Sequence, residues 1–76
     1  MSDIRALNEA VEEIFVVLED VKDMFSKWDS SYHLSFINKA MRLQTLRERL
    51  NKLGYEEEFV ETVIRIAYHN IFTSDY

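Results

Sequence analysis

Few side chains in this 76-residue chain have the types and spacing that catalysis or metal binding requires. His33 and His69 are the two histidines, and neither belongs to the Glu-x-x-His pattern with which helical bundles hold a pair of metal ions. Cysteine is absent, which excludes disulfides and thiolate ligands. The single glycine, Gly54, excludes a glycine-rich phosphate loop. We therefore expect neither a metal nor a cofactor.

The one local group that combines hydroxyls with a base is Ser30, Ser31 and Ser35 beside His33. Nucleophilic catalysis requires such a pairing of nucleophile and base. Serine is, however, the ordinary capping residue where a helix begins, and we expect a helix to begin here. We interpret the cluster as capping residues and expect no enzymatic activity from it.

A second polar group is the stretch Arg65-Ile66-Ala67-Tyr68-His69, in which Arg65 and His69 share a helix face with Glu61. The stretch resembles the Arg…His signature of HEPN-type ribonucleases, which are all-helical and often dimeric. That family has a longer separation and a polar residue after the arginine, whereas here three residues intervene and Ile66 follows Arg65. The resemblance covers five residues and implies, in the extreme case, a ribonuclease that uses Arg65 and His69. The alternative is a solvated helix face.

The apolar pattern from residue 4 to residue 28 indicates the element around which the chain is organised. Its residues follow one another at alternating spacings of three and four: Ile4, Leu7, Val11, Ile14, Leu18, Val21, Phe25 and Trp28. This spacing is typical of one face of a long helix, which we predict over 3–28. Residues 14–18 are apolar on every side, so this helix needs cover on more than one side.

Two further helices are predicted, over 34–53 and 56–72, with 29–31 as the first connection. The buried stripe expected on the second helix consists of Phe36, Ala40, Leu43, Leu46, Leu50 and Leu53. We expect Gly54 to end this helix in a left-handed conformation and Tyr55 to pack back onto Leu50. Arg47, at the edge of the stripe, is expected to pair with a carboxylate of the first helix. With no proline and 47% apolar residues, the chain is predicted to be a single all-α domain, 1–76, with three helices in a bundle.

Charge is distributed unevenly along the chain. Residues 1–29 contain eight acidic and three basic residues, 30–54 one acidic and five basic, and 55–76 five acidic and one basic. This pattern favours attraction between the second helix and its acidic neighbours. The alternative is a nucleic-acid contact through a basic face of the second helix: Lys39, Arg42, Arg49 and Lys52. The third helix opens with residues 56–58, three glutamates that repel phosphate, so we expect no nucleic-acid partner.

Association with other proteins is the function that size and patterning favour. A core this small without cross-links is commonly completed by a second subunit, and the two-fold dimer is the commonest assembly. The residues expected to self-associate are Phe15, Val16, Phe25 and Trp28. An acidic face is expected to dock onto a basic surface of another protein: Glu9, Glu12, Glu13, Glu19, Asp20 and Asp23.

The predicted role is therefore that of a small, acidic, non-enzymatic regulator, adaptor or inhibitor that acts as a homodimer. In size and charge the chain is similar to phage-encoded inhibitors, antitoxins and immunity proteins. A signal-peptide pattern and an apolar run long enough to span a membrane are both absent, so we expect no membrane partner and a cytoplasmic setting.

Overall fold

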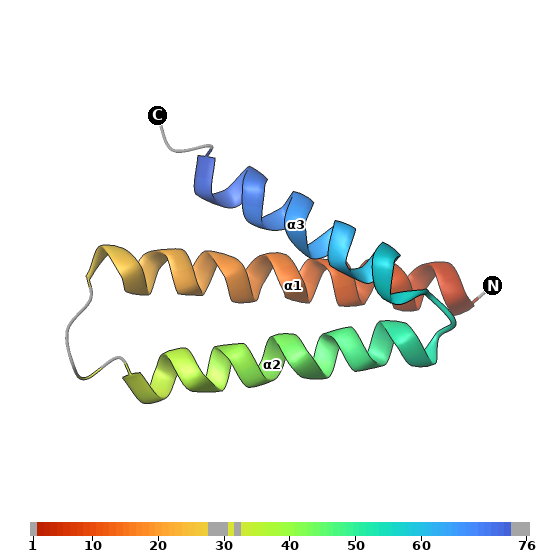
Figure 1. Cartoon of the computed structure of the whole chain (residues 1–76), viewed down its shortest axis with the longest axis horizontal. Coiled ribbons are helices and arrows are strands. Elements are labelled where there is room, and N and C mark those ends of the chain that lie inside the picture. Colours follow the sequence, from red (N-terminus) through yellow and green to blue (C-terminus); the bar gives the residue numbers. More distant parts are fainter. Residues whose placement is uncertain (1, 28–30, 32, 74–76) are drawn as a thin grey trace.

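The computed structural model describes residues 2–27, 31 and 33–73, with side chains from residue 4 onward. It contains three helices: α1 (Ser2–Ser26), α2 (His33–Lys52) and α3 (Glu57–Thr73) (Figure 1). The predicted all-α fold of three helices is confirmed, with bounds within two residues of those predicted. Trp28 and most of the 29–31 connection lie outside the described residues. None of the helices in the described ranges is long and apolar enough to cross a membrane.

The three helices are arranged around α1. In Figure 1, α2 runs antiparallel alongside α1, whereas α3 begins beside the end of α2 and then diverges from it obliquely. Helix α1 consequently contacts both other helices extensively, and α2 and α3 contact each other only near the turn that joins them. The molecule measures 42 × 28 × 20 Å, so it is only about two helices thick along its shortest axis.

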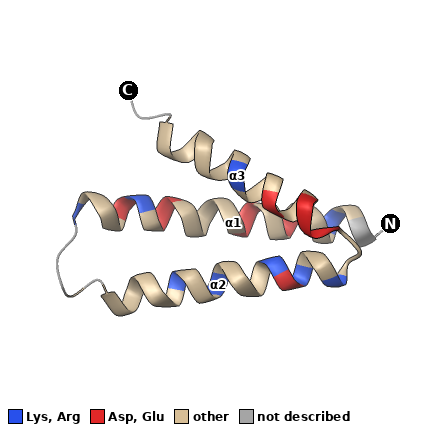
Figure 2. Cartoon of the chain, in the orientation of Figure 1, with Lys and Arg blue, Asp and Glu red and all other residues tan. Residues whose placement is uncertain are grey.

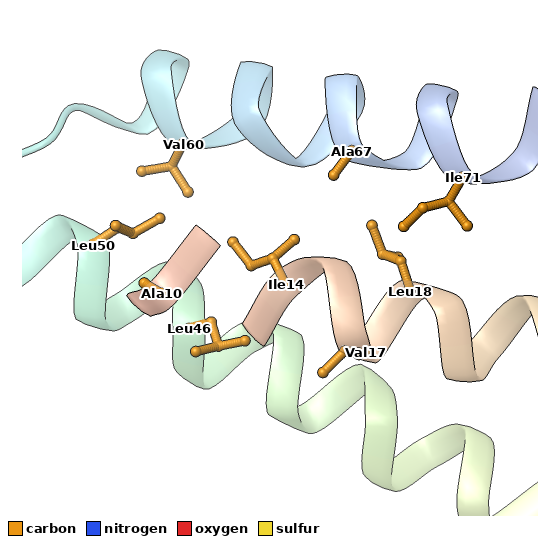
Figure 3. Close-up of a cluster of buried hydrophobic side chains, with 9 residues drawn as sticks. All are labelled: Ala10, Ile14, Val17, Leu18, Leu46, Leu50, Val60, Ala67 and Ile71. Carbon is orange, nitrogen blue, oxygen red and sulfur yellow. The ribbon is translucent and has the colours of Figure 1, made fainter. Parts of the chain in front are cut away.

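The hydrophobic core lies where all three helices meet (Figure 3). Its largest fully covered side chains are Ile14 from α1, Leu46 and Leu50 from α2, and Val60 from α3. The other members of the cluster are Ala10, Val17, Leu18, Ala67 and Ile71. Each large side chain buried in this way contributes roughly 1.5–3 kcal/mol. The core therefore confirms the apolar stripes predicted for the middle of α1 and the C-terminal half of α2.

The turn between α2 and α3 depends on Gly54, whose φ is +106°. Its amide donates to the carbonyl of Asn51 (3.0 Å), and the amide of Tyr55 donates to the carbonyl of Leu50 (3.2 Å). This pair of bonds satisfies the last carbonyls of α2 in the arrangement that a C′ glycine permits. Tyr55 packs against the core, as predicted. The turn thus places the start of α3 beside the end of α2.

Ion pairs connect α2 to both neighbours. Figure 2 shows where the charged residues lie along the three helices. Glu13 of α1 accepts from Arg42 (Nη2 to Oε2, 2.5 Å) and from Arg49 (Nη1 to Oε1, 3.0 Å). Asp20 accepts from Lys39 at 2.9 Å. The hydrogen bond from Arg42 lowers the pKa of Glu13, with a smaller contribution from Arg49, although burial opposes the shift.

The prediction that Arg47 pairs with a carboxylate of α1 is wrong. Arg47 pairs with Glu57 and Glu61 of α3, not with a carboxylate of α1. The reason is the tight turn at Gly54, which brings the acidic first turns of α3 over the C-terminal half of α2. These two ion pairs therefore hold α2 and α3 together at the end where they are joined.

Candidate protein-docking groove

An open groove lies between α2 and α3, with α1 as its floor. Its volume is about 560 Å³. Nine lining residues are apolar or aromatic: Leu18, Val21, Phe25, Phe36, Ala40, Leu43, Ile64, Tyr68 and Phe72. Three are charged: Arg47, Glu61 and Arg65. The groove exists because α3 diverges from α2, so the apolar side chains that face each other across the gap remain too far apart to cover one another.

Aromatic side chains from all three helices meet in the groove. The ring of Phe25 stacks on Phe36 with centroids 5.9 Å apart and meets the edge of Phe72 at 6.2 Å. Tyr68 stacks on Phe72 at 4.4 Å. These contacts fix the shape of the wall without burying it, since Phe25 and Tyr68 are 51% and 52% exposed.

The expectation that Phe36 and Ala40 are buried is wrong. Phe36 is 37% exposed and Ala40 is exposed as well, although Leu46 and Leu50 on the same predicted stripe are fully covered. The helical period places all four on related faces of α2, and only those near the turn are covered by α3. The sequence pattern identified the apolar face of α2. It did not show that α3 covers only the part of that face near the turn.

A second apolar feature adjoins the groove on α2. Leu34, Ile37 and Met41 follow one another at spacings of three and four, and their exposed fractions are 75%, 50% and 63%. Residues at this spacing form a stripe on one side of a helix. Neither this stripe nor the groove was recognised from the sequence, where the signal available was the surplus of apolar residues in the first half of α2.

The residues predicted to self-associate are not brought together. Phe15 is partly buried and packs against the core of its own chain. Val16 is 55% exposed and lines a shallow pocket with Glu9, Glu12, Glu13 and Arg49. Phe25 lines the groove, and Trp28 lies outside the part of the chain that the structure describes. Of the three members of the predicted set that the structure describes, Phe25 alone contributes to the groove.

Three of the six residues in the predicted acidic face form ion pairs within the chain. Glu13 and Asp20 pair with α2, and Asp23 pairs with Lys27 at 3.5 Å. Glu9, Glu12 and Glu19 are exposed. Three residues of the predicted basic face serve the same internal pairs: Lys39, Arg42 and Arg49. Lys52 is exposed and forms no ion pair with the residues described by the structure, 4–27 and 33–73. The basic surface proposed for nucleic acid is therefore largely neutralised.

The described residues considered for chemistry lie on α3 and around the start of α2. Glu61 pairs with Arg47, Arg65 lines the groove, and His69 is exposed. His33 and Ser35 are exposed at the start of α2, and Ser30 lies outside the described ranges. Among the residues that the structure describes, no cluster could hold a metal ion.

A polar depression lies outside the groove, where α1 meets the last turns of α3. Lys22 of α1 donates from Nζ to the carbonyl of Ile71 at 2.8 Å. This contact connects the C-terminal end of α3 to α1, because the carbonyls of a last helical turn lack partners within the helix.

The sequence and the structure were also compared with known proteins. No family model matches the chain, and neither the curated proteins nor the solved structures gave a significant match.

Proposed function

We propose that this protein is a non-enzymatic regulator or adaptor that receives an amphipathic helix in the groove between α2 and α3. The observation that carries this proposal is the exposure of large apolar side chains around the groove, from 37% for Phe36 to 75% for Leu34. Soluble monomers rarely expose contiguous apolar surface, and where they do it commonly marks an interaction site.

The shape of the groove favours a helix as the occupant. Helix α1 forms the floor, and α2 and α3 form two diverging walls, so a fourth helix laid between the walls would complete a four-helix arrangement. Amphipathic helices bind such grooves through apolar residues spaced three and four apart. A small-molecule site would require polar groups that are free to meet a ligand, whereas Arg47 and Glu61 of the lining already pair with each other.

The exposed carboxylates of α1 support a second contact, with a basic surface of another protein and away from the groove. Glu9, Glu12 and Glu19 are exposed on a chain of net charge −5. Charges at the edge of an interface chiefly accelerate association and contribute less to final affinity. We propose that these residues attract that other protein, whereas apolar contacts hold the helix in the groove.

A titration followed by nuclear magnetic resonance tests the docking function. The probe is a designed helical peptide with leucines at i, i+3, i+4 and i+7, and its control is a peptide of the same composition without a single apolar face. We expect chemical-shift changes to concentrate at Phe36, Ala40 and Tyr68 for the first peptide and to be absent for the second.

A pair of variants makes the test specific to the groove. Ala40→Glu places a charge among the lining residues, whereas Asn38→Glu places the same charge on an exposed position of α2 that does not line the groove. We expect Ala40→Glu to weaken peptide binding by about tenfold or more, because a charge on an apolar contact surface must be desolvated. Equal weakening by the two variants, or shifts spread over α1, would contradict the proposal.

A further inference from the structure

We infer that the helix received by the groove is α2 of a second copy of this chain, which makes the protein a two-fold symmetric dimer. The inference rests on the proposed function, because it names the occupant of the same groove. It differs from the dimer expected from the sequence, whose contact residues were Phe15, Val16, Phe25 and Trp28.

The surface is complementary to itself. Helix α2 contributes Phe36 and Ala40 to its own groove and carries the exposed stripe of Leu34, Ile37 and Met41 beside them. If each α2 lies in the groove of the other copy, Phe36 and Ala40 face their counterparts across the two-fold axis. The stripe then faces the partner's α3. One symmetry operation thereby covers both exposed features, as an isologous interface requires.

Ala40 is the residue best suited to lie at the axis. It is exposed within the groove, and its small side chain allows two helices to approach to the 8–10 Å typical of packed helices. A larger residue at this position would hold the two α2 helices apart. The inferred dimer therefore has an antiparallel pair of α2 helices that cross near Ala40.

The accessible surface is larger than a compact monomer of this mass exposes. It measures 5601 Å², whereas a folded monomer of 9.1 kDa typically exposes about 4,900 Å². The surplus of roughly 700 Å² is close to the roughly 800 Å² that each partner buries in a standard stable interface. The radius of gyration is 13.3 Å, compared with about 11 Å for a compact domain of this length. Pairing through the groove would cover part of this surplus.

The charges around the groove permit two acidic copies to meet. Between residues 33 and 41 the only Lys, Arg, Asp or Glu is Lys39, and it is paired with Asp20 of its own chain. The exposed carboxylates of Glu9, Glu12 and Glu19 are on α1, which contributes only Leu18, Val21 and Phe25 to the groove. The centre of a stable interface is depleted of charge in the same way.

Light scattering on a sizing column, over concentrations from low micromolar to near millimolar, measures the assembly. We expect the parent protein to be a dimer and Ala40→Glu to raise the dissociation constant by at least about tenfold. Asn8→Glu, at an exposed position of α1 that does not line the groove, should leave the dissociation constant unchanged. Circular dichroism should report the same helix content for all three proteins. A monomeric parent at every concentration would overturn the inference, as would a dimer that Ala40→Glu does not weaken.

Disulfide cross-linking tests the crossing point directly, because the chain has no cysteine of its own. Ala40→Cys should form a covalent dimer under mild oxidation, since a disulfide needs Cα atoms within about 7 Å. Asn8→Cys, at an exposed position of α1 that does not line the groove, should remain monomeric on a denaturing gel. Cross-linking of both variants to the same extent would overturn the inference.

A third variant separates the groove dimer from one built on α1. Val16→Asp should leave the dimer intact, and dissociation by this change would assign the interface to α1 instead. The peptide titration distinguishes the two proposals. If the parent protein is a monomer that still binds the peptide through Ala40, the docking function is supported and only the dimer is overturned. If the parent protein neither dimerises nor binds the peptide, both proposals are overturned.

Discussion

The two ends of α2 show opposite outcomes for the same kind of side chain. Near Gly54, Leu46 and Leu50 are fully covered by α1 and α3. Toward the start of α2, Phe36 and Leu34 remain 37% and 75% exposed. The difference between the closed end and the open end shows that a helix's apolar face becomes core only where a second helix actually reaches it.

The closed end is held by two local features. The turn at Gly54 keeps α2 and α3 together, and Arg47 bonds to Glu57 and Glu61 across it. Farther along, α3 follows α1 and leaves α2, so the gap between them widens (Figure 1). The closed end is therefore stable within one chain, whereas the open end presents the surface on which both proposals rest.

Truncating a core leucine should have the largest effect. Leu50→Ala is expected to cost about 2–5 kcal/mol in the free energy of unfolding, because it leaves a cavity in a fully packed core. Phe36→Ala, at the open end, should cost about 1 kcal/mol or less in the monomer, because its ring already contacts water. Urea denaturation at low protein concentration measures both. Equal losses would show that the two ends are alike and that the groove is part of the core.

Replacing the turn glycine should have the next largest effect. Gly54→Ala is expected to cost about 1–2 kcal/mol, because a residue with a Cβ rarely adopts a positive φ. The added Cβ would meet no atom within 4 Å, so the loss would be conformational and not steric. Gly54→Asn should lose less, since asparagine tolerates positive φ better. A neutral Gly54→Ala in the same urea experiment would mean that the turn does not hold the closed end.

Acidification should weaken the link between α1 and α2 by a small amount. Because the Arg42 guanidinium lowers the pKa of Glu13 in the folded chain, the contribution of Glu13 is complete well above the ordinary pKa of 4.5 and is lost as the pH falls below it. Glu13→Gln should remove up to about 1 kcal/mol of stability at neutral pH, since the paired side chains are 40–43% exposed.

The control for this titration is Glu12→Gln, which removes a neighbouring exposed carboxylate. Urea midpoints measured from neutral pH downward should converge for the parent and Glu13→Gln as Glu13 becomes protonated. If the urea midpoints of the parent and Glu13→Gln still differ by the same amount at low pH, the ion pair is not the source of the difference in stability.

The parts of the fold that depend on local patterns were predictable. The bounds of the three helices follow from apolar spacing and were predicted within two residues. The positive φ of Gly54 and the packing of Tyr55 follow from the conformational freedom of glycine at a helix end. Each of these features involves residues close together in the sequence, so the sequence alone is sufficient to predict it.

The candidate groove depends on an angle between helices, which spacing along one helix does not encode. Ala40 and Leu46 belong to one predicted stripe, yet only Leu46 is covered, because α3 diverges before it reaches Ala40. Arg47 was assigned to the correct edge of α2 and to the wrong partner for the same reason. Phe15 and Val16 were expected to belong to one self-association surface, although successive residues of a helix point in directions about 100° apart.

The contact between Lys22 and Ile71 has a consequence for the width of the groove. Helix α3 has no basic residue in its own last turn, and the ammonium group of Lys22 on α1 interacts favourably with the negative end of the α3 dipole. The joined end of α3 is fixed at Gly54, and at the other end this ammonium group adds to the packing of Ile71 and Phe72 against α1. Acetylation of one lysine outside the groove would therefore weaken one of the contacts that set how far the walls stand apart.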